Sequence, residues 1–256
     1  MSASDTLVLA WHGTRHPDGR VVPELVRRRV ARLLPGVEVR NGWVDLVDPA
    51  LADVLAEVGD CTLVPCFLAA GYHVQYDIPE AAAASGHHVE VTRHIGGLLV
   101  DALLDRLAEA GGAGDAVVLA AAGSKRPNAL AEIDAVAAGL EALLGVPVIP
   151  GNVYMTKPSV ADAVARLRAE GHEDVVVAPY LLSDGLWADH VAGLGARVAA
   201  PLGDHPRIAE AVVDLTRRPG RVIAPRRFAA SFAGAVAGPA VQLTPSAQTS
   251  RFLGEH

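Results

Sequence analysis

The feature that most constrains the fold is an internal duplication of the chain. The segment LVLAWHGTRHPDG at residues 7–19 returns as VVLAAAGSKRPNA at residues 117–129. Glycine, hydroxyl, basic and proline positions stay in register, but His12 of the first copy corresponds to Ala122 of the second. Each copy begins with an apolar run, as expected for a short parallel strand that is covered on both faces. The chain is therefore predicted to hold two related units, of which only the first keeps its histidine.

Two further pairs of segments extend the duplication in the same order. Residues 42–53, GWVDLVDPALAD, align with residues 151–162, GNVYMTKPSVAD, and residues 65–71, PCFLAAG, align with residues 179–185, PYLLSDG. Apolar strand-like runs alternate with amphipathic helical runs in both units. This alternation predicts an α/β fold of two homologous halves, each a parallel sheet flanked by helices.

The boundaries of the units follow from composition. The glycine-rich stretch GGAGD at residues 111–115 is a linker signal, so we expect an N-terminal half at 1–113 and a degenerate C-terminal half at 114–218. Residues 219–256 are rich in alanine, glycine, proline and serine and show no periodicity, which predicts a flexible low-complexity tail. Within the first half, residues 69–87 are expected to form a loop.

Composition excludes several classes of function. The 256 residues carry a net charge of −7 and no basic run, which argues against nucleic acid as a partner. The sequence contains neither a signal-peptide pattern nor an apolar stretch that would span a membrane, so we expect a cytoplasmic protein. Cys61 and Cys66 lack the CxxC spacing of redox or zinc sites, and we expect two buried, reduced thiols.

Candidate functional residues lie where the predicted strands of the first half end, since ligands bind at that edge of a parallel sheet. They are His12, Asp45, His73 and His94. Two imidazoles and a carboxylate suit a divalent first-row metal such as Fe²⁺ or Co²⁺, and imidazole accepts protons near neutral pH. A lone histidine at a strand end is commonly a capping or solvent-facing residue, so the metal interpretation depends on the pair.

Other histidines and motifs carry less information. The remaining histidines inside the two halves lie in polar, loop-like contexts and are expected at the surface: His16, His87, His88, His172, His190 and His205. No phosphate-binding loop and no nucleophile elbow occurs in the sequence. Ser124 follows a strand, but no histidine–aspartate pair accompanies it, which disfavours a hydrolase.

Two longer motifs resemble a known family. The first strand ends in His12-Gly13-Thr14-Arg15, and the third in Phe67-Leu68-Ala69-Ala70-Gly71-Tyr72-His73, followed by Asp77-Ile78-Pro79. Together with Leu202-Gly203-Asp204-His205-Pro206 in the second half, they resemble the sirohydrochlorin chelatases, the class II chelatases of siroheme and cobalamin biosynthesis, over residues 5–218.

The resemblance implies ATP-independent insertion of a divalent metal into sirohydrochlorin. The family's two active-site histidines correspond to His12 and His73, and Asp45 stands where relatives more often have Glu; all three are expected as metal ligands and catalytic groups. The predicted substrate-binding residues are Gly13, Thr14, Arg15, Gly71, Ser124, Lys125 and Arg126, of which the basic ones would pair with the eight carboxylates of the tetrapyrrole. The protein is expected to be a monomer with no tightly bound cofactor, the metal being a substrate.

The second half is not expected to hold a second active site. It has Ala122, Tyr154 and Trp187 where the first half has His12, Asp45 and His73. Fe²⁺ is favoured over Co²⁺, because some cobalt-handling relatives have histidine- or cysteine-rich tails and residues 219–256 contain one histidine and no cysteine. A cobaltochelatase of cobalamin biosynthesis, and a non-catalytic carrier of tetrapyrrole or metal, remain as alternatives.

Overall fold

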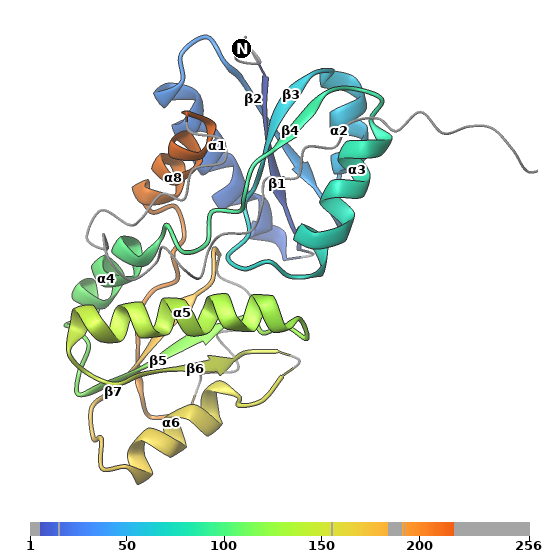
Figure 1. Ribbon diagram of the computed structural model, residues 1–256. Helices are drawn as coiled ribbons and strands as arrows, with labels where there is room; N and C mark the ends of the chain where they lie inside the picture. Colours follow the sequence, from blue (N-terminus) through green and yellow to red (C-terminus); the bar gives the residue numbers. More distant parts are fainter. Residues whose placement is uncertain (1–5, 15, 155, 184–190, 192, 218–256) are drawn as a thin grey trace, which may run out of the picture.

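The computed structural model describes residues 6–14, 16–154, 156–183, 191 and 193–217. In this part of the chain two α/β halves each contain a four-stranded sheet, and helices flank both sheets (Figure 1). The fold class predicted from the duplication is confirmed. The predicted tail at 219–256 lies outside the described residues.

The first half follows the hydrophobic pattern of its sequence. Its strands are β1 (Thr6–Trp11), β2 (Glu38–Trp43), β3 (Cys61–Pro65) and β4 (Val89–Val91). Its helices are η1 (Pro17–Arg20), α1 (Val21–Leu33), α2 (Leu51–Val58), η2 (His73–Asp77), α3 (Ile78–Ala84) and α4 (Val100–Glu109).

The second half repeats this order. Its strands are β5 (Ala116–Ala121), β6 (Val148–Asn152), β7 (Val175–Tyr180) and β8 (Arg197–Val198). Its helices within the described residues include α5 (Pro127–Leu144), α6 (Val160–Ala169) and α8 (Pro206–Arg217).

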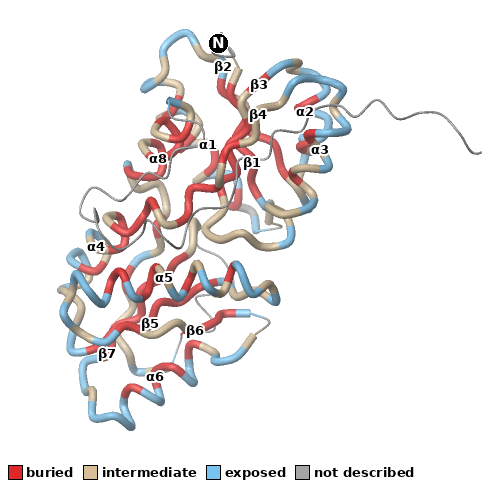
Figure 2. The backbone as a smooth tube through the Cα atoms, in the orientation of Figure 1, coloured by how far each residue is buried: buried red, intermediate tan, exposed pale blue. Residues whose placement is uncertain are grey.

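The two sheets have the same topology. Their strand orders are β2-β1-β3-β4 and β6-β5-β7-β8, and every pairing is parallel. Residues 7–11 of β1 and all of β5 are buried, because helices cover both faces of each sheet (Figure 2). The carboxyl ends of the central strands, Trp11 and Ala121, therefore reach the edge of the sheet as apolar residues followed by polar loops.

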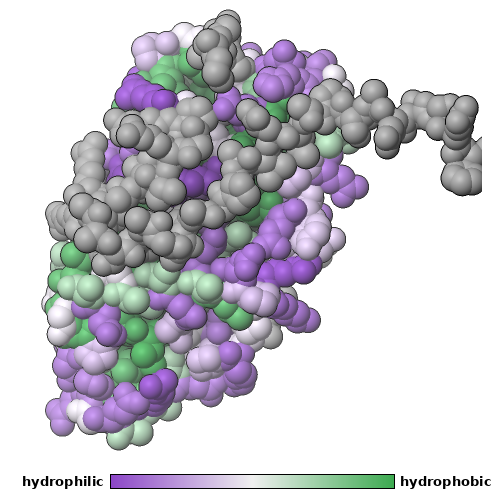
Figure 3. All heavy atoms as spheres, viewed as in Figure 1, coloured by the Kyte–Doolittle hydropathy of each residue, from purple (hydrophilic) through white to green (hydrophobic). Residues whose placement is uncertain are grey.

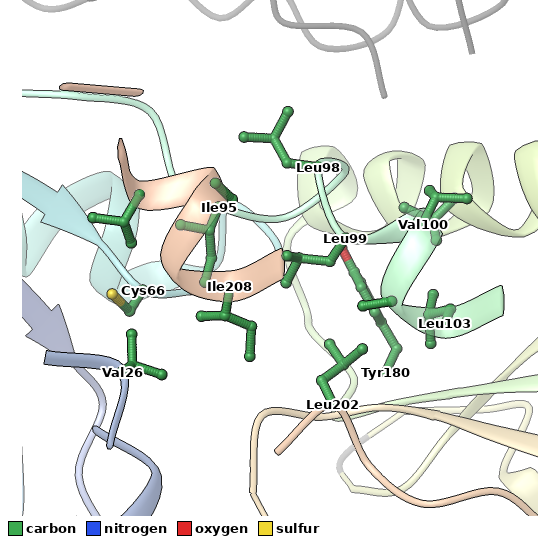
Figure 4. Close-up of a cluster of buried hydrophobic side chains, with 14 of the residues drawn as sticks. Val26, Cys66, Ile95, Leu98, Leu99, Val100, Leu103, Tyr180, Leu202 and Ile208 are labelled. Carbon is green, nitrogen blue, oxygen red and sulfur yellow. The ribbon is translucent and has the colours of Figure 1, made fainter. Parts of the chain in front are cut away.

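The last helix of each repeat packs on the other half. Helix α8 lies against α1 and β3 of the first half, and α4 lies against β7 and α5 of the second (Figure 1). One hydrophobic core consequently runs through both halves. Figure 4 shows its centre, where Leu99 and Leu103 from the first repeat surround Tyr180 together with Leu202 from the second.

The turn after the first strand is built alike in the two halves. Gly13 and Gly123 have φ angles of 98° and 93°, a region that favours glycine. A Cβ atom on Gly13 would lie 2.0 Å from the carbonyl oxygen of Asp45, and one on Gly123 would lie 2.6 Å from that of Tyr154. The repeated glycine is thus explained by a left-handed turn that packs against the neighbouring strand's loop.

The expectation of a loop at residues 69–87 is wrong. A π-helical turn, η2, begins at His73 and continues directly into α3. The run Glu80 to Ala84 has high helix propensity, and Pro79 is tolerated near a helix start. The glycine and proline that suggested a loop instead mark the entry to this helical segment, which carries one of the candidate histidines.

The state of the two cysteines and the character of the helices match what the composition predicts. Cys61 and Cys66 are free and buried, as predicted, and burial raises the pKa of Cys61 to about 11. In the described part of the chain, no helix has the length and apolar character needed to span a membrane. Figure 3 shows hydrophilic residues over much of the visible face of the second half, with smaller hydrophobic patches near α5.

Candidate active site

A cavity of about 900 Å³ opens between the two halves, at the carboxyl ends of their strands. This volume lies within the range usual for small-molecule and cofactor sites. Both halves contribute aromatic and small side chains, while the imidazoles come from the first half and the lysine and arginine come from the second. The residues that define these two walls include Trp11, His12, Trp43, Phe67 and His73 from the first half, and Ala122, Ser124, Lys125, Arg126, Ile133 and Leu182 from the second.

His12 and His73 meet in this cavity. Their ring centroids are 4.6 Å apart and their planes are 84° from parallel. His12 follows directly after β1, and His73 is the first residue of η2. The Phe67 ring lies 6.4 Å from the His12 ring and 6.2 Å from the His73 ring, which gives the pair an apolar backing.

Hydrogen bonds determine which ring nitrogens are available. His12 Nδ1 lies 2.8 Å from the carbonyl oxygen of Gly13, which can only accept, so this nitrogen carries the proton. His73 Nδ1 lies 2.5 Å from Asp77 Oδ2 and likewise donates to the carboxylate. The Nε2 lone pairs of both rings are therefore left for a metal or a proton, the arrangement typical of metal-binding histidines.

Asp77 is a site residue that the sequence reasoning did not single out. It belongs to the Asp-Ile-Pro motif, but its role depends on the π-helical turn that brings it to His73. A side chain four residues after a histidine on a helix is a regular partner, so an expectation of helix here would have revealed it.

Asp45 is not brought to the histidine pair. Its side chain is exposed, is not part of the cavity wall, and accepts a hydrogen bond of 2.8 Å from the Leu46 N–H. Its backbone N–H donates to the carbonyl of His12 at 3.0 Å. Within the residues that the structure describes, no three His, Cys, Asp or Glu side chains are grouped to hold a metal. A ligand role for Asp45 stays a prediction.

Most predicted substrate-binding residues line the cavity: Gly13, Thr14, Gly71, Ser124, Lys125 and Arg126. Arg15 lies outside the described residues. The guanidinium of Arg126 stands 5.3 Å and 4.8 Å from the ring centres of Tyr72 and Tyr76, which are stacked on each other. This cation–π cluster joins the two halves, and it holds the basic group of Arg126 at the wall of the cavity.

His94 was expected to face the cavity, but it is not part of the cavity wall. It is buried, and its Nδ1 accepts a hydrogen bond of 3.2 Å from Gly96 N–H, so its proton sits on Nε2. That nitrogen lies 3.2 Å from Glu132 Oε2 on α5 of the second half. Burial alone would raise the pKa of Glu132, but the hydrogen bonds from His94 and from the Ala70 N–H outweigh it and lower the pKa.

The other histidines expected at the surface differ in their exposure. His16, His87 and His88 are exposed as expected, the side chain of His172 is 25% exposed, and His190 lies outside the described residues. The expectation is wrong for His205, whose side chain is 13% exposed with Nε2 3.3 Å from Asp105 Oδ2. His205 is shielded because α4 and α8 each pack against the opposite half, which brings the start of α8 close to Asp105 on α4.

The second half offers no matching imidazole in its described part. Ala122 lines the cavity at the position equivalent to His12, and Tyr154 N–H bonds the Ala122 carbonyl at 3.0 Å as Asp45 N–H bonds that of His12. Trp187, the counterpart of His73, lies outside the described residues. Fold and site together define a protein of two α/β halves with one histidine pair in the cavity between them.

The chain belongs to the CbiX family, whose family model matches residues 6–110 and 116–218. A sirohydrochlorin cobaltochelatase of Methanococcoides burtonii is 29% identical over 85 residues, which are 31% of this chain and 65% of the relative. The matched region thus spans less than two thirds of that relative's length.

Solved structures share the fold. SirB from Bacillus subtilis with Fe³⁺ superposes with a TM-score of 0.71 at 20% identity, covering 83% of this chain and 94% of that one. The sirohydrochlorin chelatase SirB from Bacillus subtilis subspecies spizizenii, in complex with cobalt, gives 0.68 at 18% identity, covering 83% and 93%.

Proposed function

We propose that this protein is a monomeric cytoplasmic chelatase that inserts a divalent metal, Fe²⁺ in preference to Co²⁺, into sirohydrochlorin without ATP, in siroheme biosynthesis. One observation carries the proposal: His12 and His73 present two free Nε2 atoms to a single cavity large enough for a macrocycle. Membership of the CbiX family and the relative named as a sirohydrochlorin cobaltochelatase support the substrate class.

The histidines have two successive tasks. Insertion replaces two pyrrole N–H protons by one divalent metal, so the site must give up M²⁺ and dispose of two H⁺. While the metal is bound, the Nε2 lone pairs of His12 and His73 hold it. Once the metal has moved to the pyrrole nitrogens, the same lone pairs are free to take one proton each. The exposed position of His12 then lets protons leave to solvent.

Asp77 makes the two histidines unequal. Its carboxylate accepts the Nδ1 proton of His73 and stabilises positive charge on that ring, whereas the Nδ1 proton of His12 goes to the neutral carbonyl of Gly13. Asp45 is proposed to assist, and to reach the metal its side chain must give up the hydrogen bond to Leu46 N–H. Thr14, Lys125 and Arg126 would then receive the substrate carboxylates, with Arg15 completing the set.

A cobaltochelatase of cobalamin biosynthesis is the alternative. The curated relative is named for cobalt, and SirB structures carry either iron or cobalt. Two imidazoles bind either ion, so the histidine pair fits both metals. We keep Fe²⁺ as the proposed metal because residues 219–256 contain no cysteine and one histidine.

Turnover distinguishes these functions from one another and from a carrier. The protein is incubated anaerobically with sirohydrochlorin and either Fe²⁺ or Co²⁺, and the absorption change of the macrocycle is followed. We expect many turnovers per protein, with a higher kcat/KM for Fe²⁺. A higher value for Co²⁺ would select the alternative. Stoichiometric binding with no rate above the uncatalysed reaction would make the protein a carrier.

A further inference from the structure

We propose that Glu132 and Tyr180, both in the second half, are positioning residues for His73. Each reaches across the boundary between the halves and holds the segment 66–72, which connects β3 to the π-helical turn carrying that histidine. The second half would thereby set the geometry of the His12–His73 pair in the first half. The inference deepens the proposed function and rests on it.

Glu132 holds the segment immediately before His73. Its Oε2 atom accepts the Ala70 N–H at 2.7 Å and faces His94 Nε2 at 3.2 Å. Ala70 is in turn linked to η2, because its carbonyl oxygen accepts a hydrogen bond of 2.8 Å from Gln75 Nε2. One carboxylate on α5 therefore connects three elements of the first half: the β3 loop, the turn after β4 and, through Ala70, the π-helix.

Tyr180 holds the same segment from the end of β7. Its hydroxyl donates to the Leu68 carbonyl at 3.0 Å and accepts the Gly97 N–H at 3.0 Å. Tyr180 is 2% exposed. Its side chain lies among the buried side chains of the core that joins the halves (Figure 4). Burial raises the pKa of the phenol, so the group stays protonated and remains a donor to Leu68.

The segment also has hydrogen bonds within the first half: Cys66 N–H donates to the Ala10 carbonyl at 2.8 Å, and the Phe67 carbonyl accepts the Gly96 N–H at 3.0 Å. Residues 66–72 belong to no strand or helix, and Gly96 approaches the Leu68 carbonyl so closely that a Cβ there would lie 1.9 Å from the oxygen. The Ala70 N–H and the Leu68 carbonyl, which are part-buried, find their partners in the second half, so removing Glu132 or the Tyr180 hydroxyl leaves one of these backbone groups without that partner. Both side chains lie in the half that lacks the histidine pair, and at the position equivalent to Tyr180 the first repeat has Cys66.

The test compares Glu132→Ala and Tyr180→Phe with wild type, with Co²⁺ alone as the probe. Binding is followed through the visible ligand-field spectrum of Co²⁺, which reports ligand geometry. Loss of partners that orient metal-binding histidines lowers metal affinity by about 10- to 100-fold, and we expect at least about 10-fold for each variant with an altered spectrum. Glu132→Gln keeps an acceptor oxygen and should stay within about 5-fold of wild type.

A matched control separates positioning from general stability. Glu141 lies on the same helix and accepts a backbone N–H in the same way, from Val148 at 3.0 Å, but within the second half. Glu141→Ala should leave Co²⁺ affinity and spectrum unchanged. Equal losses in Glu132→Ala and Glu141→Ala, or wild-type binding by both Glu132→Ala and Tyr180→Phe, would overturn the inference.

The outcome is separable from the proposed function. Metal binding is measured without the macrocycle, so a protein that binds Co²⁺ in the predicted way but gives no turnover would retain the positioning role and lose the chelatase role. Normal turnover in wild type and in both variants, with unchanged KM for the metal, would retain the chelatase and remove the positioning role.

Discussion

The two halves have the same sheet topology but place different side chains at the ends of their strands. The first presents imidazoles to the cavity, and the second presents Ala122 and basic residues there while Glu132 and Tyr180 reach back into the first. The difference teaches that the half without the histidine pair still contributes to the site. It lines part of the cavity through the loop after β5, and its Glu132 on α5 and Tyr180 at the end of β7 contact the first half.

The largest effect should come from the histidines themselves. His12→Ala and His73→Ala should each lower kcat/KM for metal insertion by about 100-fold or more, and the double variant should be little worse because the two act as a unit. Ala122→His should not rescue His12→Ala, because the second half supplies no partner histidine for it. His87→Ala, at an exposed position, serves as the control. Rescue by Ala122→His would contradict the functional asymmetry of the halves.

The next effect concerns Asp77. Asp77→Asn removes the carboxylate that fixes the His73 tautomer, and we expect Co²⁺ affinity to fall by about 10- to 100-fold. Asp45→Asn is the informative comparison, since its carboxylate caps Leu46 N–H and is not part of the cavity wall. Titration calorimetry measures both. A loss in Asp45→Asn as large as in Asp77→Asn would establish Asp45 as a metal ligand.

The equivalent glycines test how far the likeness of the halves extends. Gly13→Ala and Gly123→Ala each force a Cβ against a carbonyl at positive φ, and each should lower the free energy of unfolding by about 2 kcal/mol or more. The effect should be larger for Gly13, where the contact is shorter. Urea denaturation measures stability, and Co²⁺ binding should change only for Gly13→Ala. An unaltered stability of Gly123→Ala would show that its turn is not built as described.

The smallest effect is the dependence of stability on pH through Glu132. Its pKa is lowered below the ordinary value of 4.5, so its contribution to stability is complete above that value. Below it the unfolded chain binds the proton first, and the contribution is lost as pH falls through the folded pKa. Chemical denaturation at several pH values should therefore show a shallower acid slope for Glu132→Gln than for wild type. Identical slopes would mean that ionisation of the Glu132 carboxyl does not contribute to the free energy of unfolding.

Local patterns predicted much of the fold and part of the site. The apolar runs gave the strands near their observed bounds, because a strand buried on both faces must be apolar throughout. His12 and His73 were found because each follows such a run. Asp77 was missed because glycine and proline around residues 71–79 suggested a loop. His94 was misplaced because a strand-end position does not say which way a side chain turns.

The sequence by itself determined that there are two α/β units, where their strands end, and that only the first unit carries the histidine pair. These properties depend on local periodicity and on residue identity, which can be read along the chain. Only the tertiary structure decided that α4 and α8 each pack against the opposite half and that Asp77 hydrogen-bonds His73. It also decided that Glu132 and Tyr180 contact the first half. Those contacts join residues that are remote in sequence or that depend on an irregular turn, and no local pattern encodes them.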